Sequence, residues 1–241
     1  AGGFTLDYGP FGFCELFDPR FQPWTGGGEH FSFFNQPFAA ETNFKMFCSS
    51  LLPLLLENKE YIEKLEKIKN DFSKVMSKEM QLMWAKKLGF EKYDETLTNE
   101  LFNLMVNSKA DFSIFFRKLS HIPDNISILK ESFYIPSTEE LDKKWFTWLK
   151  KWQDCINKQG DFREISKSMK QVNPKYTWRE WMIVPAYEEA EVGNYSKIRE
   201  LQTIFKNPYE EQSLEIEQKY NRLRPREFFN KGGISHYSCS S

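Results

Sequence analysis

The first residue that could do chemistry is Asp7, which follows a short β-prone stretch and precedes a Gly9-Pro10 turn. A carboxylate in this position can project into a cleft and hold Mg²⁺ against the phosphate oxygens of a nucleotide. An aspartate before such a turn can also hydrogen-bond its own turn, and the spacing alone favours that structural role. Asp7 is therefore a candidate ligand for Mg²⁺ and nucleotide phosphate, with a structural alternative left open.

The other residues of catalytic type have no spacing that predicts a reaction. The glycines at 26–28 precede no Lys-Ser/Thr pair, so they indicate a flexible loop and not a phosphate-binding P-loop. The paired carboxylates are expected at helix starts or on polar faces, and no two histidines have an i, i+4 spacing, so neither set predicts an acid/base or metal site. These residues are Asp94-Glu95, Glu139-Glu140, Glu188-Glu189, His30, His121 and His236.

The four cysteines include no CxxC pair and no zinc-type spacing, which predicts neither a structural metal nor a disulfide framework. Cys239 differs because it lies in the terminal Ser-Cys-Ser-Ser, where an exposed thiol can exchange or oxidise. It is the candidate redox residue, although an incidental terminal cysteine is an equally open interpretation. Cys14, Cys48 and Cys155 have apolar neighbours and are predicted to be buried and inert.

The composition sets limits on the partners. The chain has 241 residues, with 33 basic and 34 acidic side chains and a net charge of −1. This balance gives no global attraction to nucleic acid or anionic membrane, and the longest apolar run, residues 51–56, is too short to span a bilayer. We therefore expect no nucleic-acid and no membrane partner. Because the chain opens without an initiator methionine, we also expect a segment of a longer protein.

The elements that position these residues are expected to be helices, because glycine and proline are sparse and apolar residues make up 40% of the chain. Residues 8–37 are predicted to be one long irregular loop. The longest periodic run, 60–88, predicts an amphipathic helix whose apolar stripe faces the core. Further helices are predicted at 96–106, 111–120, 138–158, 161–170, 177–191 and 195–205.

The remaining stretches are predicted to be less regular. Residues 123–136 lie between prolines and are expected to form a loop, and Pro185 should kink or interrupt the helix predicted around it. From Pro208 onward the periodicity fades, which predicts an extended tail.

Several stretches, in this order, carry a resemblance to a known family: LDYGPFGF with FDP after it, FNQP, KKLGF, ADFSIFFRKLS, NPKYTWREW, AEVGNYSKIRELQTIFKNPYEEQ and a closing SCSS. Together they resemble the selenoprotein O family, including its bacterial YdiU members, over nearly the whole chain. The resemblance implies a mainly α fold, the C-terminal lobe of a protein-kinase-like fold with a helical C-terminal extension. It also implies a parent protein that transfers AMP from ATP to Ser, Thr or Tyr hydroxyls of other proteins.

The same resemblance assigns roles to individual residues. The family's DYG motif corresponds to the DFG of kinases, which makes Asp7 the implied ligand of Mg²⁺ and the implied contact of the ATP phosphates. In the family the catalytic Asp base, its neighbouring Asn and the ATP-binding lysine precede this motif, so we expect no catalytic base in residues 1–241 and no activity of this segment alone. Cys239 occupies the place where some relatives carry selenocysteine. In bacterial relatives this cysteine can pair with one in the activation segment, but Pro23 stands at that position here, and Cys14 is the nearby alternative.

The resemblance also suggests a division of the chain. Residues 1–37 would hold the DYG motif and an activation-segment-like loop, 38–136 the helical C-lobe, 137–207 the helical extension and 208–241 the extended tail. The expected location is mitochondrial for a eukaryotic protein and cytoplasmic for a bacterial one.

Two departures from the family pattern favour a different interpretation. Glu29-His30-Phe31 stands where the family usually has Gly-Arg-Tyr, and Thr42-Asn43-Phe44 stands where it has Trp-Asn-Leu. These differences mildly favour a non-catalytic helical binding module from a truncated or decayed family member. A second alternative is phosphate transfer of the ordinary kinase kind.

Overall fold

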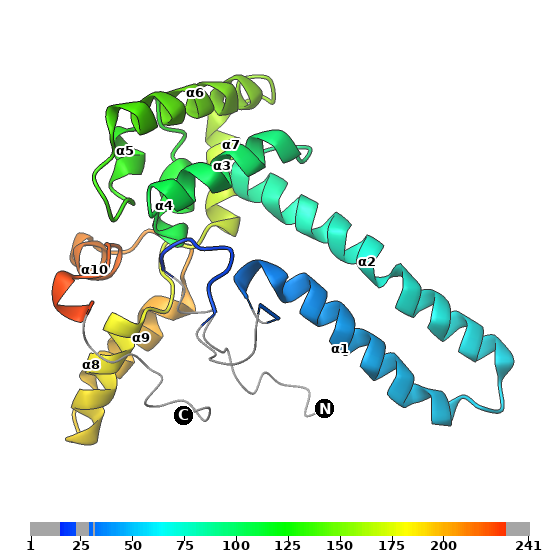
Figure 1. Cartoon of the computed structure of the whole chain (residues 1–241). Coiled ribbons are helices and arrows are strands. Elements are labelled where there is room, and N and C mark those ends of the chain that lie inside the picture. The colour runs from blue at the N-terminus through cyan, green and yellow to red at the C-terminus, as the bar shows by residue number, and fades with distance from the viewer. Residues whose placement is uncertain (1–14, 23–28, 31, 230–241) are drawn as a thin grey trace. The chain divides into compact units, whose positions relative to one another are not determined.

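A computed structural model describes residues 15–22, 29–30 and 32–229. Within these ranges the fold is helical, with no β-strand and only two isolated bridges, Leu16 to Asp111 and Ala110 to Phe133. The expectation of a mainly α fold is therefore confirmed (Figure 1). In the described part of the chain, no helix combines the length and the apolar character needed to cross a bilayer.

The chain divides into two compact units. One unit comprises Asp18–Trp84. The other, called the second unit from here on, comprises Ala1–Phe17 together with Ala85–Ser241. The glycines at 26–28, which were predicted to form a flexible loop, lie outside the described residues.

The Asp18–Trp84 unit is built mainly from two long helices. After the short η2 (Phe33–Asn35), α1 spans Gln36–Leu51, η3 spans Leu52–Leu54, and α2 spans Lys59–Leu88. The predicted helix at 60–88 is thus confirmed to within one residue. The stacked rings of Phe44 and Phe72, with centroids 4.8 Å apart, join α1 to α2.

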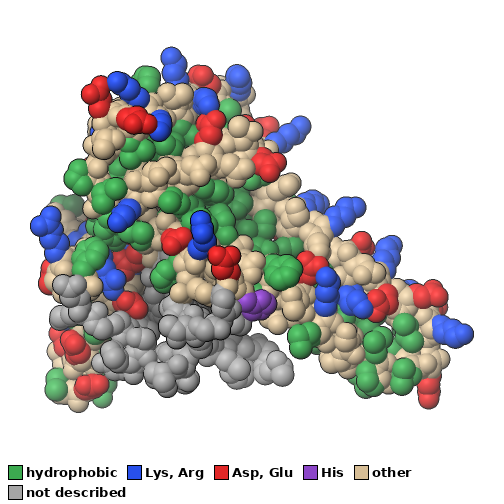
Figure 2. Space-filling model, in the orientation of Figure 1, with side chains coloured by type: hydrophobic (Ala, Val, Ile, Leu, Met, Phe, Trp, Pro, Cys, Tyr) green, Lys and Arg blue, Asp and Glu red, His purple; other side chains and the backbone are tan. Residues whose placement is uncertain are grey.

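The apolar stripe of α2 is only partly covered. Leu65, Phe72 and Met76 are half-buried, as expected for a stripe that faces the core. The prediction was wrong for five other residues of the stripe, whose side chains stay exposed. In Figure 2, charged side chains of both signs alternate with apolar ones along α1 and α2. The exposed residues of the stripe are Tyr61, Ile68, Val75, Leu82 and Met83.

The second unit contains all the other predicted helices. Four of them begin one residue after an aspartate or threonine whose side chain accepts a hydrogen bond from a backbone N–H of the first turn. These N-caps are Asp94, Asp111, Thr138 and Asp161. The helices are α3 (Glu95–Asn107), α4 (Phe112–Leu119), α6 (Glu139–Ile156), α7 (Phe162–Val172), α8 (Glu180–Glu191) and α9 (Ser196–Lys206).

The structure corrects two predictions in this unit. The predicted loop at 123–136 contains α5 (Ser127–Lys130), and the predicted extended tail after 208 contains α10 (Leu214–Tyr220) and η4 (Arg226–Phe228). These helices are too short to give a clear period, but the buried Tyr220 docks α10 on an apolar cluster. The helix around Pro185 is not interrupted, since α8 continues across it from Glu180 to Glu191.

Three tryptophans of α6 form the centre of the second unit. Trp145, Trp148 and Trp152 are buried at spacings of three and four, so they lie on one face of the helix. Each indole N–H donates to a different segment: to Ser108 Oγ at 2.7 Å, to Leu97 O at 2.9 Å and to Leu88 O at 2.9 Å. One helix face thereby fixes both ends of α3 and the end of α2.

The described cysteines differ in burial. Cys48 is buried in α1, as predicted. The prediction was wrong for Cys155, which is only half-buried because it lies beside the tryptophan face of α6 and not on it. Cys14 lies outside the described residues.

Replacement of Trp152 by alanine tests the role of the tryptophan face. We expect Trp152→Ala to lower the free energy of unfolding by about 3–5 kcal/mol, because it opens a large cavity and leaves the Leu88 carbonyl without its indole donor. Phe146→Ala is the matched control, since Phe146 lies on the same helix but is exposed, and we expect a change within about 0.5 kcal/mol. Urea unfolding measures both, and equal losses in the two variants would contradict this assignment of the core.

Candidate functional site

The sequence-predicted site residues Asp7 and Cys239 lie outside the described residues, as do Cys14 and Pro23. The first residue that the structure describes is Glu15, eight residues after Asp7. The structure therefore describes what holds the segment that follows the DYG motif, and the candidate functional site is built from that segment.

Residues 15–17 are attached to the start of α4. Phe112 N donates to Glu15 O at 2.9 Å, and Phe17 N donates to Ala110 O at 2.8 Å. The Phe17 ring is buried and stacks on Phe112, with 5.7 Å between the ring centroids. Backbone and side-chain contacts together fix this segment on the second unit.

A buried ion cluster lies at the same place. Arg179 donates to both oxygens of Asp111, at 2.5 and 2.9 Å, and to Glu15 Oε2 at 3.1 Å. The Tyr134 hydroxyl lies within donating distance of Glu15 Oε2 (3.2 Å) and Asp111 Oδ2 (3.3 Å), and it accepts from Arg224 N at 3.2 Å. Asp111 also caps α4 through Ile114 N, so this one carboxylate joins a helix start to the cluster.

The cluster places two carboxylates against one guanidinium away from water. Burial raises the pKa of Glu15, and the negative Asp111 raises it further, although Arg179 opposes both effects. Burial would lower the pKa of Arg179, but the two carboxylates raise it above its ordinary value and keep the side chain cationic. Burial and the same carboxylates raise the pKa of Tyr134, so its hydroxyl remains a neutral donor. Such an arrangement can hold a segment in place but offers no exposed acid or base.

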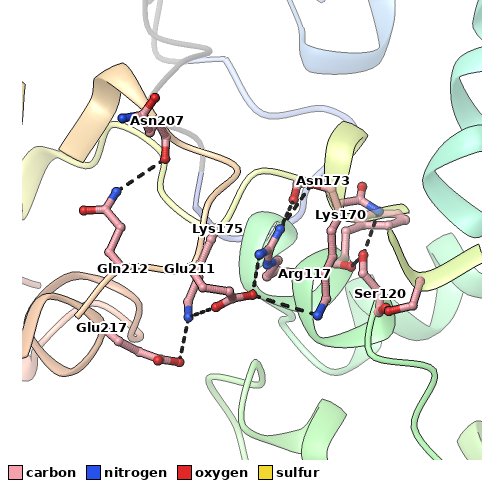
Figure 3. A network of polar contacts seen from close by, with 11 residues as sticks. Arg117, Ser120, Lys170, Asn173, Lys175, Asn207, Glu211, Gln212 and Glu217 are labelled. Carbon is pink, nitrogen blue, oxygen red and sulfur yellow. Dashed lines mark hydrogen bonds and ion pairs between the residues drawn. The ribbon is translucent and has the colours of Figure 1, made fainter. Parts of the chain in front are cut away.

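A second polar network surrounds Glu211 (Figure 3). Arg117 Nη2 donates to Glu211 Oε1 at 2.5 Å, Lys175 Nζ donates to Oε2, and Lys175 also pairs with Glu217 at 3.0 Å. Burial would raise the pKa of Glu211, but the hydrogen bonds from Lys175 and Arg117 lower it to about 2. Glu211 is therefore an anion at neutral pH and ties the segment after α9 to α4.

Arg117 and Asn173 connect this network to the end of α7. Arg117 Nη1 donates to the carbonyls of Lys170 and Asn173, both at 3.2 Å, which places a cation at a helix C-terminus. Asn173 in turn accepts from Lys87 Nζ at 2.8 Å and donates to Lys87 O and to Ser120 Oγ. Burial lowers the pKa of Lys87 to about 8. These contacts fix α4, α7 and the end of α2 together.

The sequence did not identify Glu15, Tyr134 or Arg179 as site residues. Asp111 was recognised only as a helix start, because the local spacing carries no sign of its distant guanidinium partner. Among the described residues no group of three or more His, Cys, Asp or Glu side chains could hold a metal ion.

Comparison with known proteins gives one consistent result. Residues 2–206 match the family described as "Protein adenylyltransferase SelO". Over 99% of its length the chain is 33% identical to the protein nucleotidyltransferase YdiU of Methylobacillus flagellatus, 32% to that of Tolumonas auensis and 31% to that of Aromatoleum aromaticum. The matches cover 47%, 47% and 46% of those proteins, so the chain spans about half the length of the curated relatives it matches.

The charge balance of the cluster can be tested with Arg179→Met. We expect a loss of about 3–5 kcal/mol in the free energy of unfolding at pH 8, because two carboxylates lose their cation while remaining buried. Burial already raises the pKa of Glu15, and without Arg179 it rises further, so the folded variant binds a proton more readily than the unfolded chain near pH 5. The loss in the free energy of unfolding should therefore be smaller at pH 5 than at pH 8, by about 1 kcal/mol or more.

Lys143→Met serves as the control for this prediction, because Lys143 pairs with Glu139 on the exposed face of α6. Unfolding of this variant in urea should match that of the unmodified chain at both pH values. A loss for Arg179→Met that is the same at pH 5 and pH 8 would contradict the assignment of two buried carboxylates to one guanidinium.

Proposed function

The chain belongs to the SelO family of protein adenylyltransferases, and from this membership we propose that it forms the C-terminal part of an enzyme that transfers AMP from ATP to hydroxyl side chains of proteins. The observation that carries the proposal is the family match over residues 2–206, which includes the DYG motif. The three relatives are all named protein nucleotidyltransferases, which supports the same reaction class. Their bacterial sources favour a bacterial cytoplasmic protein over a mitochondrial one.

In this proposal Asp7 holds Mg²⁺ and, through it, the phosphates of ATP. A single carboxylate suits Mg²⁺, which is usually bound by one or two carboxylates together with substrate phosphates. When bound, the ion neutralises charge on the phosphates during nucleotidyl transfer. The described residues contain no competing group of metal-binding side chains.

The ion cluster supplies the positioning that this role requires. Glu15 and Phe17 are fixed on α4 by backbone hydrogen bonds and by Arg179. A loop that carries a metal ligand must hold that ligand within a fraction of an ångström for efficient transfer. We assign Arg179, Asp111 and Tyr134 as positioning residues that limit the freedom of the segment after the DYG motif.

The segment 1–241 by itself is proposed to be inactive. In the family the catalytic Asp base, the second Mg²⁺ ligand and the ATP-binding lysine precede the DYG motif, and transfer needs these groups at once. We further propose Cys239 as a redox-sensitive thiol of the tail.

One observation favours a non-catalytic alternative. The exposed apolar residues of α2, including Ile68 and Val75, recur at intervals of seven, which is typical of a helix that receives a partner helix. A truncated or decayed family member could retain such a binding surface without retaining catalysis.

Labelled ATP tests the proposed reaction on the full-length protein that carries residues 1–241. With Mg²⁺, we expect label from [α-³²P]ATP to appear on protein and label from [γ-³²P]ATP not to appear. Asp7→Ala should lower the transfer by about two orders of magnitude, because the charge on the phosphates is no longer neutralised. Asp154→Ala, which removes an exposed aspartate of α6, is the control and should transfer normally.

The outcomes separate the alternatives. Transferred γ-label would indicate an ordinary kinase. No transfer of either label would favour the binding module. Full activity of Asp7→Ala would remove Asp7 from the mechanism.

A further inference from the structure

The second unit contains an open pocket of ≈ 1030 Å³ that no proposed role above uses. Its walls come from the turn after α4, the end of α6, one face of α7 and residues 209–210. Pockets that bind small molecules have volumes of about 300–1,000 Å³, so the space is large enough for a ligand of nucleotide size.

One wall of the pocket is cationic. Arg163, Lys167 and Lys170 line it at spacings of four and three, which places them on the same face of α7. Arg163 and Lys167 are exposed and form no ion pair with any residue in the described ranges. Lys170 lies 3.9 Å from Glu211, whose two oxygens are already bound by Arg117 and Lys175.

The carboxylates of the pocket do not neutralise this wall. Asp124 and Glu210 also line the space, which leaves one positive charge in excess on the walls. Behind the wall, Arg117 and Lys175 are balanced by Glu211 and Glu217, so the excess charge of the pocket comes from its own walls. His121 also lines the pocket. Burial lowers the pKa of its side chain, and the nearby cation Lys170 lowers it further.

Hydrogen bonds hold the walls of the pocket in place without a ligand. Gln153 Nε2 donates to Pro123 O at 2.8 Å, and Ser166 Oγ donates to Ser120 O at 2.6 Å, so α6 and α7 both hold the turn between them. Ile122 in this turn has φ 51, which is a strained conformation for a β-branched residue. Such strain persists only where the surrounding structure imposes it, and it is frequent in ligand-binding segments.

The remaining walls suit the organic part of a ligand. Phe162 and Tyr209 line the pocket with side chains that are 47% and 44% exposed, and Asn157 adds an amide. Aromatic faces bind flat rings, and Arg and Lys side chains bind phosphate through charge-assisted hydrogen bonds.

We propose that this pocket binds a phosphorylated small molecule of nucleotide size, with its phosphate on Arg163, Lys167 and Lys170 and its organic part against Phe162 and Tyr209. The site requires neither Asp7 nor the nucleotidyl transfer proposed above. It is therefore testable on the chain of 241 residues.

Isothermal titration calorimetry of the chain with three probes tests the proposal. We expect adenosine monophosphate to bind more tightly than inorganic phosphate, because it uses both the cations and the aromatic faces, and adenosine to bind most weakly. The double variant Arg163→Gln/Lys167→Gln should weaken the binding of adenosine monophosphate by roughly tenfold or more, since it removes two charged donors. Both side chains are exposed, so the thermal melt of the variant should be unchanged.

Two further variants control this experiment. Lys206→Gln removes an exposed lysine at the end of α9, outside the pocket, and Asp7→Ala removes the proposed metal ligand; neither should change the affinity. Unchanged affinity in the double variant would overturn the proposal, as would no saturable binding of adenosine monophosphate or equal affinity for adenosine. Loss of binding in Asp7→Ala alone would place the nucleotide at the DYG motif and would also overturn it.

Discussion

The organisation of the second unit depends on one buried guanidinium that serves two carboxylates. Arg179 lies between Asp111 and Glu15, and all three are largely out of contact with water. A buried carboxylate without a cation is costly, so Arg179 stabilises the fold by offsetting the burial of both carboxylates. Because Asp111 also begins α4 and Glu15 belongs to the segment after the DYG motif, the same interaction joins the helical core to the proposed nucleotide-binding loop.

The other polar contacts extend this constraint through the unit. Tyr134 brings the backbone of Arg224 to the cluster, so a segment near the end of the chain meets one near its beginning. On the far side of α4, Arg117 holds the end of α7 and the segment at Glu211. The helix α4 thus carries polar anchors for the loop, for α7 and for the segment that precedes α10, while the tryptophans of α6 supply the apolar packing.

The sequence predicted the helices far better than the site. Periodicity and helix-start residues such as Asp111 and Thr138 are local signals, and they located α2 and the longer helices of the second unit to within a few residues, although no bounds were predicted for α1. The same signals could not tell which flank of α2 is covered, because Ile68 and Leu65 are equally apolar. Nor could they predict α10, whose stability comes from docking Tyr220 and not from a period. Arg179 was missed because its partner Asp111 lies 68 residues away in the chain, and no spacing rule connects such a pair.

The most direct test of the account is amide hydrogen exchange of Phe17 and Phe112, whose N–H groups join the segment at Glu15 to α4. If the ion cluster fixes this segment, both amides exchange as slowly as those of α6 in the unmodified chain. In the Arg179→Met variant both amides should then exchange markedly faster than the amides of α6. Fast exchange of Phe17 in the unmodified chain, or equal protection in the variant, would contradict the claim that Arg179 holds the loop after the DYG motif.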